Sequence, residues 1–492
     1  MLFVVVMSAR LPLLAKTGFI LDPKPLAEAS SAHAGVLAFS RAYRSLKLPQ
    51  LIGANLKLKA RQRGFEEAQL VETLILLQIV GGDCPEDIGW LNSDPMLGRA
   101  LGYDLPKVSA LRSFLERFHD EELAQQRPAR EEQKSFIMPA SGPVEGLQRV
   151  QAGLVGRVAK KYGEQGRGLL IGTIDQDATI IECHKRAALA HYEGGRGFQP
   201  MVAVWAEADL VVADQWRDGN VPASQAPLEC ARLAFAALPD SVKQRYFRGD
   251  SACHENELID WLRSAERQAE PGGGIGFCVS ARMTPELQKS AASVREPDWQ
   301  TFGKDPDGTQ RQWAELDFVP GQRGEKKDQK PLRYVGLRLL KPQGMLFADG
   351  SDRHHYGVVS NLIWEGGRLL QWHREKAGTV EHVHDEVKNA LAGAHVPSQL
   401  FGANAAWFKL NLLAYNLGSA VKGLCLEPDE RLVRWKKLRL LIVHLAGRLN
   451  RNNCVLRLRF CASTEAIKRL QKVWEVFQLP TQASRIQPFP DG

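Results

Sequence analysis

With 492 residues, of which 44% are hydrophobic, the chain is too long for one small domain and can bury several cores. Its net charge of +8 is a modest excess, which bears on binding partners only where basic residues cluster. The eight cysteines are scattered without a CxxC pair, which excludes a small disulfide-rich secreted domain and favours a reducing compartment. The opening run "MLFVVVMSARLPLLAK" lacks the features of a signal peptide and is too short to cross a bilayer, so we expect a soluble cytoplasmic protein.

The first part of the chain has the apolar period of helices. Leu70, Leu74 and Leu77 recur at three- and four-residue steps up to Gly81, which ends the helix, and "KVSALRSFLERF" repeats the pattern. The basic stretch "LKLKARQRG" lies just upstream. We expect an N-terminal helical domain over residues 1–125, which either binds DNA or is a helical bundle that assembles the protein. A polar linker with Pro, Gly and Ser follows at 126–143.

Three predicted strands come next, in "GLLIGTIDQDATII", "FQPMVAVWAE" and "DLVVADQW", and then helix, strand, helix and strand up to "GIGFCVSA". Three strands that pair as a meander, followed by alternating helices and strands, predict an α/β fold with a mixed sheet flanked by helices. This is the connectivity of the RNase-H-like fold. The expected parts are a first catalytic part at 144–280, an antiparallel β-rich insertion at 281–372, completion by a Glu-bearing helix at 373–425 and a basic C-terminal region at 426–492.

Two aspartates interrupt the first of these strands, although burying unpaired carboxylates is costly. Asp175 and Asp177 share one face because side chains alternate along a strand. Asp250 follows the fourth strand, which lies beside the first in this connectivity. Carboxylates that converge need a cation, and oxygen ligands select hard ions, Mg²⁺ or else Mn²⁺. The sequence therefore predicts a metal site at the ends of these two strands.

The helix "TVEHVHDEVKNALAGA" after the insertion offers a third carboxylate. Glu381, Asp385 and Glu386 are candidates, and Glu381 shares one flank of the apolar stripe with Lys388. The helical period does not choose between the flanks. Three carboxylates can hold two metal ions, which activate a water or a 3′ hydroxyl and neutralise the scissile phosphate in phosphoryl transfer on nucleic acid. Lys388 is then either a phosphate contact or a surface lysine.

Positive charge clusters most strongly from Arg431 to Arg459, where nine Arg or Lys residues occur without an acid. Such a stripe is typical of phosphate contacts, although a solvated cationic helix face has the same pattern. We favour nucleic acid as the partner because acids are absent over the whole stretch. The candidate DNA contacts in its first part are Arg434, Lys436, Lys437 and Arg439.

The ordered set "TIDQDAT", "GFQPMVAVW", "RGDSACHENELIDWL" and "VEHVHDEVKNALAG" resembles the DDE transposases of bacterial insertion sequences, most closely the insertion-sequence 1380 group. The resemblance covers most of the stretch from residue 64 to residue 460. It implies three metal ligands: Asp177, which the superfamily pattern Asp-x-Thr selects over Asp175, then Asp250 and Glu381. In the family signature of Tyr, Arg, Glu and Lys, the last two match Glu381 and Lys388. Arg374 stands at the Tyr position and a residue without charge, Ala377, at the Arg position.

The resemblance implies an enzyme that binds the terminal inverted repeats of its own element, cleaves a strand at each end and joins the 3′ hydroxyls to target DNA. It implies Mg²⁺ as cofactor, a homodimer that holds two ends together, and a place in the bacterial cytoplasm at the nucleoid. Two other hypotheses stay open. One is an inactive or domesticated relative that binds DNA without cutting it. The other is a glycosyltransferase that uses "DQD" to hold a sugar nucleotide, which would leave Glu381 and the basic stripe without a role.

Arg374 is the candidate phosphate contact at the position where the family has Tyr. We expect Arg374→Ala to weaken binding and cleavage of the transposon ends, because a guanidinium that contacts a phosphate contributes to affinity regardless of sequence. Gel-shift and strand-cleavage assays on DNA carrying the inverted repeats that border the reading frame measure both. Unchanged binding and cleavage would remove Arg374 from the DNA interface.

Overall fold

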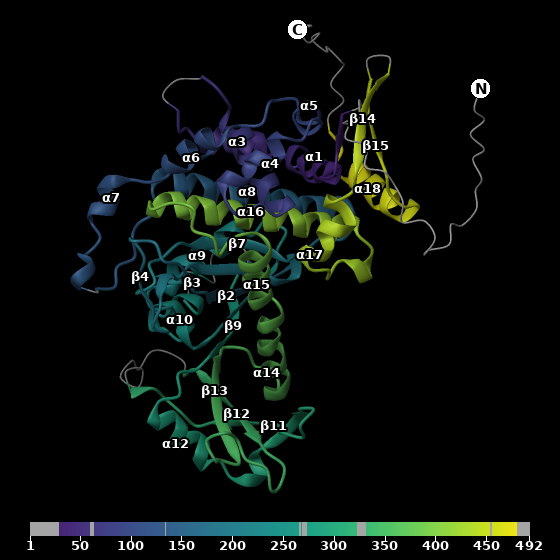
Figure 1. The fold of residues 1–492 in the computed structure, drawn as a ribbon. Helices are drawn as coiled ribbons and strands as arrows, with labels where there is room; N and C mark the ends of the chain where they lie inside the picture. The colour runs from purple at the N-terminus through teal and green to yellow at the C-terminus, as the bar shows by residue number, and fades with distance from the viewer. Residues whose placement is uncertain are drawn as a thin grey trace, which may run out of the picture.

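The computed structural model describes residues 29–479, except 60–62, 133, 265–266, 268–272, 322–330 and 453–454. The opening run "MLFVVVMSARLPLLAK" lies outside the described residues. In Figure 1 a helical body lies above a central sheet, and a β-rich lobe extends below it. No helix within the described ranges has the length and hydropathy that a membrane crossing requires.

The centre of the molecule is a nine-stranded sheet with the order β10-β11-β12-β13-β9-β8-β2-β6-β7. Strand β2 pairs antiparallel with β6 and parallel with β8, β6 and β7 are antiparallel, and β8 and β9 are parallel. The predicted order of three strands, helix, strand, helix and strand is therefore present. These elements are β2 (Ile171–Ala178), β6 (Met201–Trp205), β7 (Leu210–Gln215), α9 (Pro227–Ala237), β8 (Gln244–Gly249), α10 (Asn256–Leu262) and β9 (Ile275–Ser280).

Helices cover both faces of β2, which explains why the strand is an almost continuous buried run. On one face, Gln176 donates to the Pro227 carbonyl at the start of α9 (2.9 Å). On the other face, where Asp175 and Asp177 point, lies α15 (Val380–Ala390). The two aspartates thus face a helix that follows the insertion in the chain.

The β7 edge of the sheet is closed by side chains from two long helices. Gln148 and Gln151 of α8 (Gly142–Glu164) donate to the carbonyls of Val212 and Val211, and Asn416 of α16 (Phe401–Cys425) bonds both backbone groups of Val211. An open strand edge would present unpaired backbone groups to other chains. These amide side chains pair the edge instead and join the helical body to the sheet.

The insertion is antiparallel, as predicted, and it continues the central sheet because β13 pairs with β9. Its hairpins pair in succession and form the lower lobe in Figure 1. Its elements are α12 (Pro285–Ser293), β10 (Gln300–Lys304), β11 (Gln310–Leu316), β12 (Arg333–Leu340) and β13 (Arg353–Ser360), followed by α14 (Gly366–Arg374).

Two small sheets have no counterpart among the sequence-based expectations. Strands β3 (Ile181–Glu182), β4 (Leu189–Ala190) and β5 (Arg196–Phe198) form one of them, in the segment of the chain that connects β2 to β6. Strands β1 (Ser30–Ser31), β14 (Gly447–Asn452) and β15 (Val455–Phe460) form the other. The basic C-terminal stretch is therefore divided between two kinds of structure. Its first residues lie on α17 (Trp435–Leu438) and the π-helical turn Arg439–Val443. Its last residues lie on the hairpin of β14 and β15, which α18 (Thr464–Val476) follows.

The helical body surrounds α16, which is buried along almost its whole length, as expected of a central helix. The predicted N-terminal helices include α3, which stops before Gly81 in a left-handed conformation (φ 107°). The helices of this part are α1 (Leu37–Ser45), α2 (Leu48–Asn55), α3 (Glu67–Val80), α4 (Ile88–Asn92), α5 (Leu97–Leu101), α6 (Val108–Glu116) and α7 (Glu121–Gln125).

Close packing of α16 makes one of its glycines irreplaceable. A Cβ added at Gly418 would lie 2.1 Å from the ring of Trp435, which is fully buried. We expect Gly418→Ala to lower the free energy of unfolding by about 1–3 kcal/mol, because an overpacked core must shift. The matched control is Gly156→Ala in α8, where a Cβ meets no atom within 4 Å and the better helix former should add about 0.5–1 kcal/mol. Denaturant unfolding of both variants measures this, and equal shifts would contradict the packing argument.

Candidate active site

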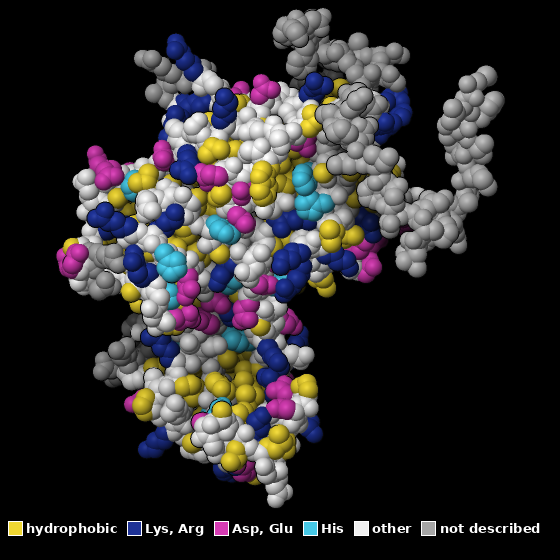
Figure 2. Space-filling model, viewed as in Figure 1, with side chains coloured by type: hydrophobic (Ala, Val, Ile, Leu, Met, Phe, Trp, Pro, Cys, Tyr) yellow, Lys and Arg dark blue, Asp and Glu magenta, His cyan; other side chains and the backbone are white. Residues whose placement is uncertain are grey.

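The predicted acids of the sheet lie at the ends of two neighbouring parallel strands. In the register of β2 and β8, Asp175 is opposite Arg248 and Gln176 opposite Gly249. Asp177 and Asp250 follow one step later on their strands, so both lie at the same end of the sheet. Figure 2 shows acidic side chains gathered, with basic and histidine side chains beside them, where the molecule narrows toward the lower lobe.

Asp175 is fully buried and is bound within the protein. Arg248 donates to its two oxygens at 2.6 and 2.8 Å, and the Thr379 hydroxyl donates to it as well. The same guanidinium donates to the Trp372 carbonyl (2.6 Å) and lies over the Trp372 ring. A buried charge of this kind is tolerated because it is paired and hydrogen-bonded. Asp175 therefore joins β2, β8, α14 and the start of α15.

Asp177 lies nearer the surface, and its partner is a lysine. The Lys376 ammonium is 2.9 Å from Asp177 Oδ2 and comes from the 3₁₀ turn Glu375–Gly378 between α14 and α15. Burial lowers the pKa of Lys376, but the charges of Asp177 and Asp250 outweigh it and raise that pKa above its usual value. The ammonium is thus held in the field of both carboxylates.

Asp250 follows β8 and accepts a hydrogen bond from the Ala252 amide (3.0 Å). Burial raises the pKa of its carboxyl, and the nearby charge of Asp177 raises it further, while Lys376 opposes the shift. A cation bound near both carboxylates would relieve the repulsion between their charges. Hard divalent ions prefer such carboxylate oxygens, so the donor set fits Mg²⁺ or Mn²⁺.

The helix α15 presents one flank to these carboxylates. Burial lowers the pKa of His384 to about 4, and the charge of Asp177 opposes this shift. Lys388 Nζ is 3.3 Å from the Thr179 hydroxyl just after β2. Glu381 lies one turn before His384 on this flank, and its side chain is exposed.

The other two candidate acids of the helix point elsewhere. Glu386 is buried and accepts from the Trp435 amide, and Asp385 pairs with Arg434 (2.9 Å). Both therefore tie α15 to α17. Among the described residues, no three His, Cys, Asp or Glu side chains gather closely enough to hold a metal ion. The structure therefore does not bring Glu381 together with Asp177 and Asp250, and Glu381 stays a predicted ligand.

A hollow of about 490 Å³ opens next to the carboxylates. Its wall contains Thr179 and Lys388, and Tyr192, which is 78% exposed, stands at it. The hollow begins at Ala178, one residue past Asp177, and Asp177, Asp250 and Glu381 are not among the residues that line it.

The predicted DNA contacts differ in how exposed their charged groups are and in whether these groups are bound within the protein. Lys436 and Lys437 are exposed, and Arg374, whose side chain is 63% exposed, makes only a distant ion pair with Asp305 (3.8 Å). Arg439 donates to the carbonyls of Ile79, Gln78 and Ala390, so its guanidinium joins α3, α15 and the C-terminal region.

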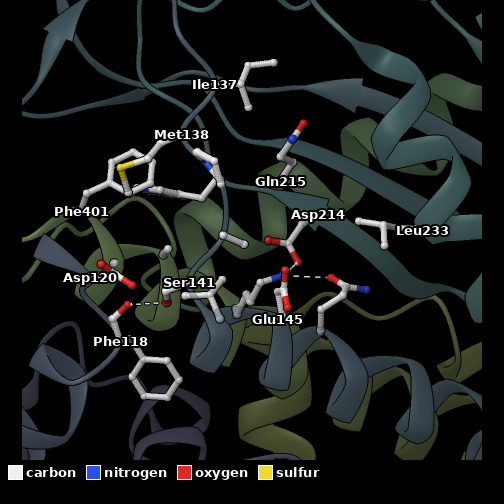
Figure 3. A pocket seen from close by; sticks show the side chains of 18 of the residues that line it. Phe118, Asp120, Ile137, Met138, Ser141, Glu145, Asp214, Gln215, Leu233 and Phe401 are labelled. Carbon is white, nitrogen blue, oxygen red and sulfur yellow. Dashed lines mark hydrogen bonds and ion pairs between the residues drawn. The ribbon is translucent and has the colours of Figure 1, made fainter. Parts of the chain in front are cut away.

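A second hollow, of about 460 Å³, lies in the body between α8, α9, α16 and the end of β7 (Figure 3). Phe118, Met138 and Phe401 form an apolar wall. Asp214 beneath it pairs with Lys409 at 2.6 Å, and both side chains are almost inaccessible. None of the predicted site residues lines this hollow.

Sequence reasoning missed four residues of the site, namely Arg248, Lys376, Thr379 and His384. Signals existed for two of them. Arg248 stands two residues before Asp250, as Asp175 stands two before Asp177, so adjacent parallel strands bring the pair together. His384 shares the helical flank of Glu381 and Lys388. Nothing in the local pattern distinguishes Lys376 from a surface lysine.

These features define an α/β protein with an acidic site at one end of its central sheet. The family described as transposase DDE domain group 1 matches residues 27–481. Because this match covers most of the chain, the protein belongs to this family of DDE transposases. The comparison with curated proteins finds no match. A similar solved structure is that of the piggyBac transposase in a synaptic complex with hairpin DNA, at 9% identity and a TM-score of 0.44, covering 93% of this chain and 86% of that chain.

The two aspartates of β2 should differ in their effect on stability. We expect Asp175→Asn to lower the free energy of unfolding by about 3–5 kcal/mol, because it leaves the buried Arg248 charge with only the exposed Glu375 as a carboxylate partner. Asp177→Asn should cost much less, since its side chain is 19% exposed and Asp250 still balances Lys376. Thermal and denaturant unfolding of both variants at neutral pH give the comparison. Equal destabilisation would mean that Asp177 is as structural as Asp175.

Proposed function

We propose that this transposase binds the terminal inverted repeats of a bacterial insertion sequence of the 1380 group and catalyses metal-dependent strand cleavage and strand transfer. The observation that carries the proposal is the pair Asp177 and Asp250 at neighbouring ends of β2 and β8, where the charge of one raises the pKa of the other. The strand order around them, with β2 between an antiparallel and a parallel neighbour, is that expected of an RNase-H-like catalytic domain.

Asp177, Asp250 and Glu381 are the proposed metal ligands, and Mg²⁺ is the proposed metal, with Mn²⁺ as a substitute. Two ions held by these residues would activate a water or a 3′ hydroxyl and stabilise the leaving oxygen in an in-line displacement. The carboxyl-only donor set supports the choice of a hard ion. Glu381 is exposed on the first turn of α15, on the same flank as His384 and Lys388.

The other residues of the site position these ligands. Asp175, bound by Arg248 and Thr379, holds the end of β2 against β8 and α15. His373 of α14 donates to the Gly249 carbonyl (3.0 Å) and so fixes the residue before Asp250. Burial keeps the pKa of His373 near 4, which leaves it neutral at physiological pH. Asp175 and His373 are therefore positioning residues in this proposal.

DNA would approach along the basic residues around α15 and α17. Lys388 at the hollow, Arg374 on α14 and the exposed Lys436 and Lys437 are the proposed phosphate contacts, together with Arg434 at the edge of α15. Such contacts determine affinity and its salt dependence. Since cleavage of two ends must be coordinated, we propose a homodimer that works in the bacterial cytoplasm at the nucleoid.

One observation bears on the alternative of a DNA-binding relative without catalysis. The Lys376 ammonium occupies a position at Asp177 from which it neutralises the carboxylate. A permanently neutralised ligand would bind metal poorly and leave only DNA binding. Catalysis and binding must therefore be measured separately.

The experiment is strand cleavage and joining on DNA carrying the repeats that border the reading frame, with Mg²⁺, Ca²⁺ or EDTA. We expect products only with Mg²⁺ or Mn²⁺. Asp177→Asn, Asp250→Asn and Glu381→Gln should each lower the cleavage rate by at least about a hundredfold, the scale on which single electrostatic groups act in active sites, while DNA binding stays near that of the wild type.

Glu286→Gln, on an exposed turn of α12 in the insertion, is the matched control and should cleave normally. Binding without any metal-dependent product would favour the inactive relative. If Glu381→Gln alone remains active, the third ligand is another residue.

A further inference from the structure

Lys376 is a charged side chain at the site to which the proposed mechanism gives no role. Its side chain is 9% exposed, and its ammonium is 2.9 Å from Asp177 Oδ2. A lysine is rarely buried unless it is paired. Here the partner is Asp177, and Asp250 is close enough for its charge to act on the ammonium as well.

The backbone around Lys376 is held firmly. The Thr379 amide donates to the Lys376 carbonyl (3.1 Å). The Thr379 hydroxyl lies within hydrogen-bond distance of the same carbonyl (3.0 Å) and of Asp175, and its single proton can be donated to either of them. Arg248 binds the adjoining Glu375 (3.3 Å) and the Trp372 carbonyl. A change at this place is therefore confined to the flexible side chain of Lys376, whose four-carbon stem can swing.

An ammonium and a divalent ion have the same electrostatic reason to lie between Asp177 and Asp250. Magnesium binds carboxylate oxygens at about 2.0–2.1 Å, which is closer than the ammonium of Lys376 lies to Oδ2. Asp177 Oδ1 meanwhile accepts from the Ala178 amide (2.9 Å). A metal ion at Oδ2 would repel the ammonium at short range, so the two cations cannot share this oxygen.

We infer that Lys376 is an internal counter-cation that competes with the divalent metal for Asp177 and leaves the carboxylate when the metal binds. This inference rests on the proposed function, since it takes Asp177 as a metal ligand. Before metal binding, Lys376 neutralises the charge of Asp177. It also lowers the affinity of the site for metal.

The first test measures Mn²⁺ binding to the full chain without DNA, from the electron paramagnetic resonance signal of free Mn²⁺. We expect Lys376→Met and Lys376→Gln to bind Mn²⁺ about tenfold more tightly or better, because removing a unit charge a few ångströms away is worth at least that factor. Lys376→Arg keeps the charge and should not bind more tightly than the wild type. Equal affinity in the wild type, Lys376→Met and Lys376→Gln would overturn the inference.

The second test uses the wild-type protein and does not depend on the folding of a variant. Reductive methylation of lysines, followed by mass spectrometry of peptides, should modify Lys376 several times faster with Mn²⁺ than without it, because the displaced ammonium leaves its carboxylate. Lys436, which is exposed and far from the carboxylates in the chain, provides the reference rate and should not change. An unchanged rate at Lys376 under saturating Mn²⁺ contradicts displacement.

Asp177→Asn separates this inference from the proposed function. If Asp177→Asn binds Mn²⁺ as well as the wild type, the proposed metal site itself is wrong. The other outcome is that Asp177→Asn loses Mn²⁺ binding, the Lys376 variants bind Mn²⁺ as the wild type does, and Mn²⁺ does not change the methylation rate of Lys376. In that case the metal site stands and the competition by Lys376 is wrong.

Discussion

The buried ion pair between Asp175 and Arg248 is the interaction on which the site depends. It joins neighbouring positions of β2 and β8, and through Thr379 and the Trp372 carbonyl it reaches α14 and the turn before α15. Removing either partner would leave an unpaired buried charge, which is far more costly than the pair itself. The strand ends that carry Asp177 and Asp250 are thereby fixed relative to the helix that carries Glu381.

Around this pair, the site separates structural charges from charges that are available to a ligand. Asp175, Glu386 and Arg439 are bound by partners within the protein, whereas Asp177, Glu381 and Lys388 lie at or near the surface. Lys376 stands between the two groups, since it is buried but faces the aspartates. The bound charges thus hold the elements of the site together, while the accessible charges at the end of the sheet can contact a ligand.

Much of the central sheet and of the helix α15 beside it was predictable from local patterns. The alternation in "GTIDQDATII", the three-strand meander and the apolar stripe of α15 each depend on residues close in the chain, and β2, β6, β7 and α15 lie where these patterns predict them. The short strands β3, β4 and β5 escaped prediction because two- and three-residue strands have no period. The six-residue strands β14 and β15 escaped it as well, and β14 also pairs with β1, from the other end of the described chain.

The chain alone was enough to indicate the mixed sheet, the acids Asp177 and Asp250 and the family resemblance, because each rests on residue type, spacing and order. Only the tertiary structure distinguished Asp175 from Asp177 by their partners, directed Glu386 toward α17 rather than toward the aspartates, and brought Lys376 to the carboxylates. The physical reason is that side chains on one face are equivalent in a periodic pattern. Their burial and pairing depend on segments up to about 200 positions away in the chain.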